Sequence, residues 1–202
     1  MRIGPLLSLA AVLAAAVPCA YGQSREAYCG AALLADFDPA ADRAHSGRYV
    51  NSTYGYSVTI PPGLTAVTSA SGPERGFMIR LSTAPRAFLS VDASYDAFYD
   101  ITAAGVHRRD LNTIDLHDAV LEDAVAAATL AHSAGGRYRM RVQCRGHSSV
   151  GVHEEVIVLR KREIYRVDLQ STPERYAQDE RLLEAVLKSW RWERLRPATP
   201  QR

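Results

Sequence analysis

The chain has 202 residues, of which 47% are hydrophobic and 23% charged, and its formal net charge is +2. This composition is that of one ordinary globular domain, and it excludes a disordered chain and a collagen-like repeat. Because 24 Lys and Arg residues balance 22 Asp and Glu residues, the chain lacks the strong positive charge of a dedicated nucleic-acid-binding protein.

The first 22 residues have the pattern of an export signal. Arg2 supplies a positive charge, and an apolar run extends from Leu6 to Val17 before Pro18. Such a run has the length of a signal-peptide core and is too short for a comfortable membrane span. Small residues predict cleavage after Gly22, with cleavage after Ala20 or an uncleaved anchor as alternatives. We therefore expect a periplasmic or secreted protein that has no membrane span after cleavage and no nucleic-acid partner.

Two cysteines, Cys29 and Cys144, follow the signal segment. A pair of cysteines in an exported chain most often forms a disulfide. This disulfide would tie the N-terminal segment to a strand in the second half of the chain. The alternative is two buried free thiols.

The first half of the remaining chain is expected to contain short strands and then a helix. Residues 23–47 form a lead-in segment, with a short helix over Arg25–Leu34. Strands are predicted where β-branched and aromatic residues lie between turn residues, at Tyr49–Ser52, Tyr56–Ile60, Phe77–Ser82 and Phe88–Tyr95. A helix is predicted over Leu111–Ala128, because apolar residues there recur at steps of three and four.

The second half reads as three strands and a closing helix. Polar and apolar residues alternate strictly over Arg137–Cys144, and further strands are predicted over Val150–Leu159 and Ile164–Leu169. Thr172 and Pro173 are typical of a helix start, and the helix is expected to extend to about Trp192. The chain is thus predicted to form one α+β domain over residues 48–192, with a mainly antiparallel sheet, helices packed on it and a flexible tail over 193–202.

A strand with the sequence Tyr-Gly-Tyr runs into Pro-Pro-Gly over Tyr54–Gly63. Near the other end, strand Ile164–Leu169 is followed by Thr172-Pro173-Glu174 and by a helix that ends in Leu187-Lys188-Ser189-Trp190. Together these features resemble PsbP-like domains over about residues 48–192. The resemblance implies an α/β/α sandwich around an antiparallel sheet. It also implies a role as an adaptor or assembly protein rather than an enzyme.

One candidate site lies on the last two predicted strands. If the turn between them is centred on Lys161-Arg162, Glu155 lies opposite Asp168, with His153 and Arg166 on the same face. Two carboxylates and an imidazole can hold a divalent metal, or can raise the pKa of one carboxylate for acid–base chemistry. The alternative is a solvated strand face on which Arg166 neutralises the acids.

A second candidate lies on the opposite face of the same strands. If the preceding turn is residues 146–149, Arg141 lies opposite Glu154, and Arg139 lies on the same face. Because that face is otherwise largely apolar, an Arg141–Glu154 pair would be partly buried. Such a pair is costly unless it is well hydrogen-bonded, so it would serve specificity or anion binding.

No common catalytic or phosphate-binding motif is present in the sequence, and no cofactor is predicted. The favoured function is therefore an exported, non-catalytic interaction or assembly module of the bacterial cell envelope, with an envelope protein as its partner. The alternative is a small-ligand or metal-binding periplasmic protein, or an enzyme, that uses His153, Glu155 and Asp168. Trp190 and Trp192 are expected to cover the edge of the core, or, if exposed, to contact the partner.

Overall fold

A computed structural model describes residues 43–68, 74–83, 86–98, 102–115, 119–143 and 150–194. Two helices lie in these ranges, α1 (Ala103–Asp115) and α2 (Tyr176–Ser189). The strands are β1 (Arg43–His45), β2 (Arg48–Asn51), β3 (Tyr56–Thr59), β4 (Ala66–Thr68), β5 (Gly76–Thr83), β6 (Arg86–Tyr95), β7 (Ala119–Leu130), β8 (Ser133–Gln143), β9 (Val150–Arg160), β10 (Glu163–Ser171) and β11 (Arg191–Trp192).

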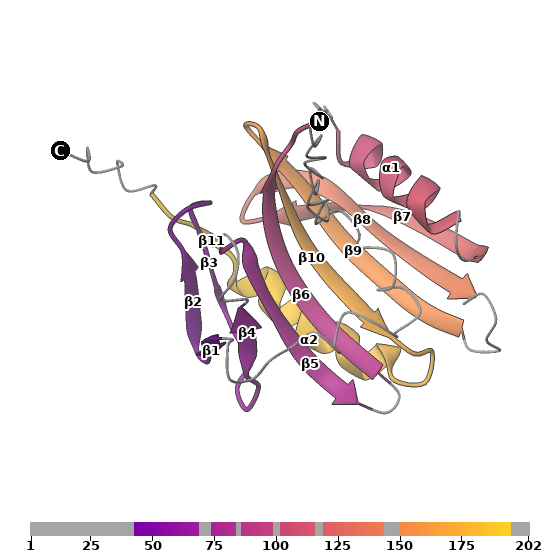
Figure 1. The fold of residues 1–202 in the computed structure, drawn as a ribbon, viewed down its shortest axis with the longest axis horizontal. Helices are drawn as coiled ribbons and strands as arrows, with labels where there is room; N and C mark the ends of the chain where they lie inside the picture. Colours follow the sequence, from indigo (N-terminus) through magenta and orange to yellow (C-terminus); the bar gives the residue numbers. More distant parts are fainter. Residues whose placement is uncertain are drawn as a thin grey trace, which may run out of the picture.

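Most strands form one eight-stranded sheet in the order β1-β4-β5-β6-β10-β9-β8-β7. Every neighbouring pair in this sheet is antiparallel. A second sheet has the order β11-β3-β2 (Figure 1). The predicted α+β class and the mainly antiparallel sheet are therefore confirmed, and the last helix follows the last long strand as expected.

The two helices contact opposite faces of the large sheet (Figure 1). His107 of α1 contacts Glu155 of β9, whereas Tyr176 of α2 contacts the neighbouring residue Glu154. Successive residues of a strand point to opposite faces, so these two contacts place the helices on different sides. The face that α1 contacts carries the polar cluster described below, and the face that α2 contacts carries the main core.

The core lies between α2, β3 and the middle strands. Leu183 and Val186 of α2 are fully buried against it, as are Tyr56 and Trp190. The rings of Tyr56 and Trp190 stack at 4.5 Å with an interplanar angle of 11°. Burial of side chains of this size contributes roughly 1.5–3 kcal/mol each to folding. Trp190 therefore covers the core edge, as one of the two sequence interpretations expected.

The first two predicted strands are confirmed, and they pair as a hairpin. β2 and β3 pair in register from Arg48 opposite Thr59 to Asn51 opposite Tyr56. The Asn51 carboxamide oxygen accepts hydrogen bonds from the backbone N–H groups of Thr53 and Tyr54, which is how asparagine closes a turn.

The helix predicted over Leu111–Ala128 is wrong. The helix lies earlier, at Ala103–Asp115, and Ala119–Leu130 is strand β7. β7 pairs with β8 along its length, with a register shift between Val120 and Glu122. This pairing outweighs the helix preference of its alanines, because tertiary hydrogen bonding routinely overrides a weak intrinsic propensity.

The closing helix is shorter than predicted. It begins at Tyr176, because the backbone N–H groups of Arg175 and Tyr176 donate to the Thr172 carbonyl in a turn that precedes the helix. It ends at Ser189, and the backbone of Trp190 turns to an extended conformation there. Trp192 then belongs to β11, where it pairs with Tyr56 of β3.

Several predictions fall on residues outside the described ranges. These are the export signal, most of the lead-in segment with its short helix, Cys29 and Cys144. Among the described residues, no helix is both long enough and apolar enough to span a membrane.

Candidate functional site

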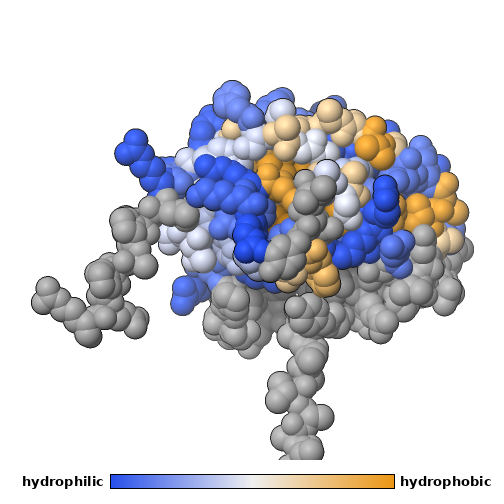
Figure 2. Space-filling model, turned by 90° about the horizontal axis from the view of Figure 1, so that it is seen from above, coloured by the Kyte–Doolittle hydropathy of each residue, from blue (hydrophilic) through white to orange (hydrophobic). Residues whose placement is uncertain are grey.

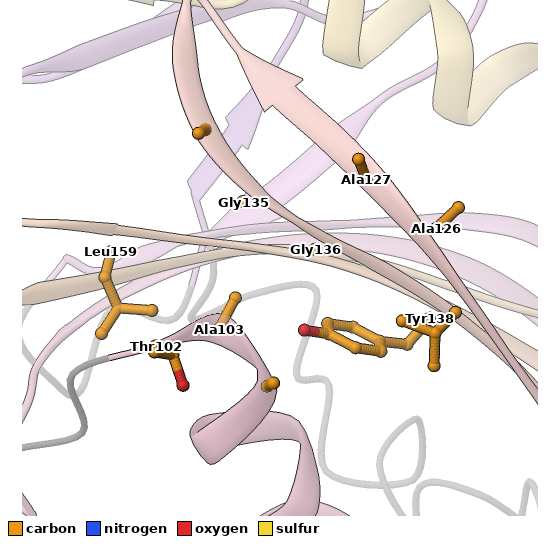
Figure 3. A pocket seen from close by; sticks show the side chains of 11 residues that line it. Thr102, Ala103, Ala126, Ala127, Gly135, Gly136, Tyr138 and Leu159 are labelled. Atoms are coloured by element: carbon orange, nitrogen blue, oxygen red, sulfur yellow. The ribbon is translucent and has the colours of Figure 1, made fainter.

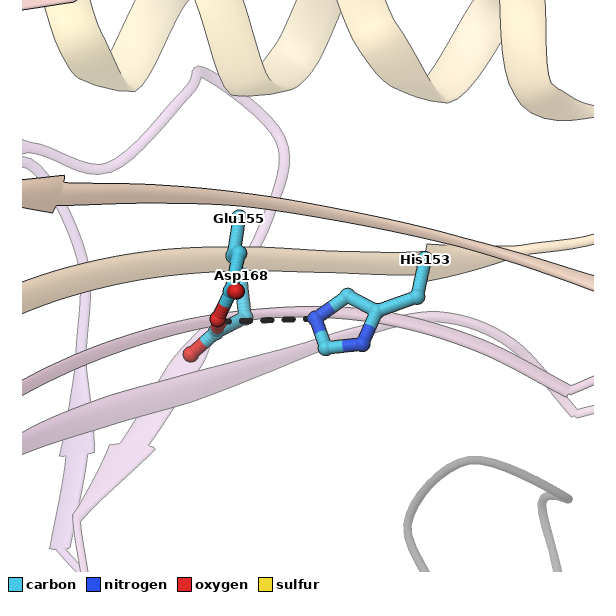
Figure 4. A group of neighbouring side chains, drawn as sticks. All are labelled: His153, Glu155 and Asp168. Carbon is cyan, nitrogen blue, oxygen red and sulfur yellow. Dashed lines mark ion pairs between the residues drawn. The ribbon is translucent and has the colours of Figure 1, made fainter. Parts of the chain in front are cut away.

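The polar cluster of β9 and β10 lies on the sheet face that α1 contacts. Glu155 is directly opposite Asp168, which confirms the predicted register of these two strands. His153, Glu155 and Asp168 each offer one ligand atom, and these atoms all lie within 4.8 Å of one another (Figure 4). His153 Nε2 is 3.5 Å from Asp168 Oδ1. The structure therefore brings the three predicted residues together.

His107 of α1 completes this cluster. Its Nδ1 is 2.5 Å from Glu155 Oε1, and its Nε2 is 3.3 Å from Asp123 Oδ2 of β7. Its ring also stacks on Tyr138 of β8, at 3.9 Å and 12°. A side chain of Gly136 would collide with the Tyr138 ring, so this glycine leaves the space in which the ring lies. His107 thus joins the helix to three strands.

Sequence reasoning did not find His107. The predicted helix began at Leu111, which left His107 in an unassigned segment with no other ligand residue at a suitable spacing. His107 can be recognised as a site residue only when α1 is placed at Ala103–Asp115. It then lies on the buried side of this helix, next to Val106.

Burial perturbs the acids around the cluster. Arg166 of β10 donates to Asp110 of α1 over 2.6 Å. Burial nevertheless raises the pKa of Asp110 to about 6, against the attraction of Arg166. Burial raises the pKa of Asp92 of β6 as well. The Ser90 hydroxyl, also on β6, donates to Asp168 Oδ2 over 3.4 Å. The predicted neutralising role of Arg166 is therefore directed mainly at Asp110.

These groups permit two kinds of chemistry. Carboxylate oxygens and imidazole nitrogens are ligands for divalent transition metals, and His153, Glu155 and Asp168 have the spacing for one ion. The second kind of chemistry is proton binding by the neighbouring His107. Burial disfavours the charged form of His107, but its hydrogen bond to Glu155 prevails and the pKa of His107 is raised.

The opposite face carries a different ion network. Arg137 Nε donates to the buried Glu154, which also accepts a hydrogen bond from the Tyr176 hydroxyl. Arg137 further contacts Glu184 at 2.5 Å and Glu180 at 3.0 Å. This network ties β8 and β9 to α2 and leaves the Glu154 carboxylate fully engaged.

The predicted Arg141–Glu154 pair is wrong. Arg139 lies opposite Glu154, and Arg141 lies opposite Val152. The register differs by two residues from the one that a turn at residues 146–149 would give. A shift of two preserves the faces, so Arg139 and Arg141 still lie on the face of Glu154. The guanidinium of Arg139 lies 5.6 Å from the centre of the Tyr176 ring.

β7 is a long outer edge of the described sheet. It has 12 residues, and Leu121 and Val125 expose 55% and 66% of their surface. Natural edge strands are usually short, or carry lysine or proline that prevents further pairing. The sequence of β7 has neither residue, and its charged residues are confined to Glu122 and Asp123. The other edge, β1, is three residues long and contains Arg43 and His45.

A pocket flanks β7 on each face of the sheet. The first has a volume of about 530 Å³ and lies between the start of α1 and strands β7 and β8 (Figure 3). Small and apolar residues form most of its lining, among them Ala103, Val125, Ala127, Gly136, Tyr138 and Leu159. The second, of about 410 Å³, lies beside α2. Its lining includes Ala128, His132, Arg137, Glu184, Lys188 and Arg191. Apolar side chains also reach the surface between hydrophilic ones in the view from above (Figure 2).

No protein-family model and no curated protein matches the chain. Among solved structures it is similar to cyanobacterial PsbP (CyanoP) from Synechocystis sp. PCC 6803, with a TM-score of 0.50 and 18% identity over 78% of this chain and 95% of that one. It is also similar to PA94 from Pseudomonas aeruginosa, a protein of unknown function, with a TM-score of 0.41 and 10% identity over 64% and 91% of the two chains. A third is LpqN, involved in cell envelope biogenesis of Mycobacterium tuberculosis, with a TM-score of 0.36 and 9% identity over 79% and 88%.

These findings define an α+β protein with a mostly antiparallel sheet, a polar cluster on one face and a long strand at the edge of the described sheet. Its fold resembles that of PsbP, as the two sequence features at Tyr54–Gly63 and Ile164–Trp190 indicated. At this identity the likeness concerns the fold alone.

Proposed function

We propose that the protein is an exported, non-catalytic interaction module of the bacterial cell envelope, periplasmic or secreted, and that it binds another protein chain along the outer edge of β7. The observation that carries the proposal is this 12-residue edge with a pocket on either side. The pattern of an export signal in residues 1–22 supports the location. The PsbP-like resemblance, with helices on both faces arranged as an α/β/α sandwich, supports the class.

Strand addition explains how such an edge would bind. A partner strand forms main-chain hydrogen bonds with the edge, and its side chains point alternately to the two faces. The pocket beside α1 suits an apolar side chain, since alanine, valine and glycine line much of it. The pocket beside α2 suits an acidic one, because its lining has three basic side chains and one acidic one, namely Arg137, Lys188, Arg191 and Glu184.

Site-specific photo-cross-linking in the exporting cell tests this proposal. A photoreactive residue in place of Val125, at the edge, is expected to give a discrete covalent adduct with one other chain. The same residue in place of Ala185, which is exposed on α2, is the matched control and is expected to give none. The proposal is wrong if position 125 gives no adduct, or if both positions give the same adducts.

A second candidate function is the binding of a divalent metal ion by His153, Glu155 and Asp168. The observation that favours it is the convergence of their ligand atoms within 4.8 Å. Titration of the purified protein with Zn²⁺ and with Mn²⁺ by calorimetry tests it. His153→Gln and Glu155→Gln are expected to abolish binding, whereas His132→Gln, in an exposed turn, should leave it unchanged. Absence of binding to the unaltered protein, or equal binding by His153→Gln, would exclude this function.

A further inference from the structure

We infer that the chain that occupies the outer edge of β7 is a second copy of this protein. The two β7 strands pair antiparallel about a two-fold axis at Ala126 and join the two large sheets. This inference rests on the proposed function, because it names the partner of the same edge. Closed two-fold pairs are the commonest assemblies of soluble proteins, and they require a surface that is complementary to itself.

The register follows from the regular part of the strand. The pairing of β7 with β8 is shifted between Val120 and Glu122, and it is regular from Glu122 to Leu130. Ala126 is the midpoint of that regular part. A two-fold axis there places Val125 of each copy opposite Ala127 of the other, and Ala124 opposite Ala128. Small side chains therefore meet along the centre of the contact, where two backbones can approach without steric hindrance.

The side chains of a second copy suit the two pockets. Ala126, Ala124 and Glu122 pair with Arg137, Arg139 and Arg141 of β8, so they share the face of α2, whereas Val125 shares the face of α1 with Tyr138. In the proposed register, Val125 of the second copy lies beside Ala127, at the apolar pocket. The exposed Val125 of each copy thus contacts the apolar pocket of the other copy.

The charges are complementary in the same register. Glu122 of the second copy lies opposite Leu130, at the end of β7 where His132, Lys188 and Arg191 line the second pocket. Asp123 lies opposite Thr129. The acidic ends of the two strands are therefore far apart. Like charges that face each other would destabilise a sheet pair, and none do so across this contact.

Sedimentation of the purified mature protein, with a charge exchange at the axis, tests the inference. The unaltered protein is expected to form a dimer in a concentration-dependent manner. In Ala126→Glu and in Ala126→Lys, two like charges face each other at the axis of the interface, so the dimer dissociation constant should rise about tenfold or more. An equimolar mixture of the two variants should dimerise again, because opposite charges then meet. Circular dichroism checks that each variant is folded.

The matched controls are Leu121→Glu and Leu121→Lys, which add the same charges to β7 at the register shift itself, outside the regular part that forms the contact, and should leave the dimer intact. If the unaltered protein is a monomer but still cross-links to a different protein through position 125, the partner is not a second copy, and the proposed function stands. A dimer that is insensitive to both Ala126 variants would also overturn this inference. A monomer with no adduct at position 125 would overturn both.

Discussion

Glu155 of β9 lies opposite Asp168 of β10, and each carboxylate has an imidazole beside it. His107 Nδ1 is 2.5 Å from Glu155 Oε1, and His153 Nε2 is 3.5 Å from Asp168 Oδ1. Two directly opposed acids would repel each other on a sheet. The imidazole of His107 offsets this repulsion at Glu155, so the helix that supplies it is held to the sheet by an interaction that depends on protonation.

The stability of the protein should therefore fall as the pH rises. The pKa of His107 is raised above 6.5 in the folded state, so its stabilising effect is complete below 6.5 and is lost as the pH passes through the folded pKa. Burial raises the pKa of Asp110 from 3.8 to about 6, so its effect is lost between these values. Both groups bind protons more tightly in the folded state, and their effects have the same sign.

Urea unfolding measured from about pH 4 to about pH 8 checks this pH dependence. The free energy of unfolding should decrease along the series. His107→Gln should flatten the part of the curve above 6.5, and Asp110→Asn should flatten the part below about 6. If the curves of His107→Gln and Asp110→Asn keep the slope of the unaltered protein in these windows, the two groups do not bind protons more tightly in the folded state.

Replacement of Glu155 by alanine should destabilise the protein. Glu155 is 1% exposed, and His107 would lose its partner inside the fold. Loss of a buried hydrogen bond to a charged group costs about 1–3 kcal/mol. Glu174→Ala, an exposed control, should have almost no effect in the same unfolding measurement. Equal stability of the two variants would mean that the His107–Glu155 contact contributes nothing.

Trp190 should be the most sensitive position in the core. Its side chain is fully buried and stacks on Tyr56, next to Tyr165 and Trp192. Truncation of a buried tryptophan to alanine typically costs about 3–5 kcal/mol. Trp190→Phe, which keeps an aromatic ring, should lose less, and thermal unfolding of the two variants measures the difference. A small and equal loss in both would place the main core elsewhere.

Gly135 and Gly136 should respond differently to alanine. A Cβ at Gly135 would lie 2.2 Å from the Ile157 carbonyl oxygen, a backbone atom that cannot move without disturbing β9. A Cβ at Gly136 would instead meet the ring of Tyr138, a side chain that can shift without moving the backbone but loses its stacking on His107. Overpacking typically costs about 1–3 kcal/mol, and we expect Gly135→Ala to lose more stability than Gly136→Ala in chemical unfolding. The reverse order would contradict this packing.

Local turns decided how much of the site could be predicted from the sequence. The turn at Lys161-Arg162 joins β9 to β10 directly, so it fixed the register and brought Glu155 opposite Asp168. The connection from β8 to β9 is longer than four residues, and the assumed turn therefore placed Arg141, instead of Arg139, opposite Glu154. The faces were still correct, because the difference was an even number of residues.

Two features depended on contacts that sequence patterns do not contain. β7 is rich in alanine, and its identity as a strand comes from its pairing with β8. His107 reaches Glu155 because α1 crosses the sheet at that point, and nothing in the local sequence specifies the crossing. The edge position of β7 in the described sheet and the contact of His107 with the polar cluster both follow from tertiary structure.

Hydrogen–deuterium exchange of the β7 backbone tests most directly whether its outer edge binds another chain. In an antiparallel edge strand, alternate N–H groups point away from the sheet and exchange unless a further strand covers them. If a second copy covers the edge, exchange within residues 122–130 should slow as the concentration of the purified protein rises, while exchange in α2 stays constant. Rapid exchange in β7 that is the same at every concentration, and unchanged when extract of the exporting cell is added, would contradict an edge that binds protein.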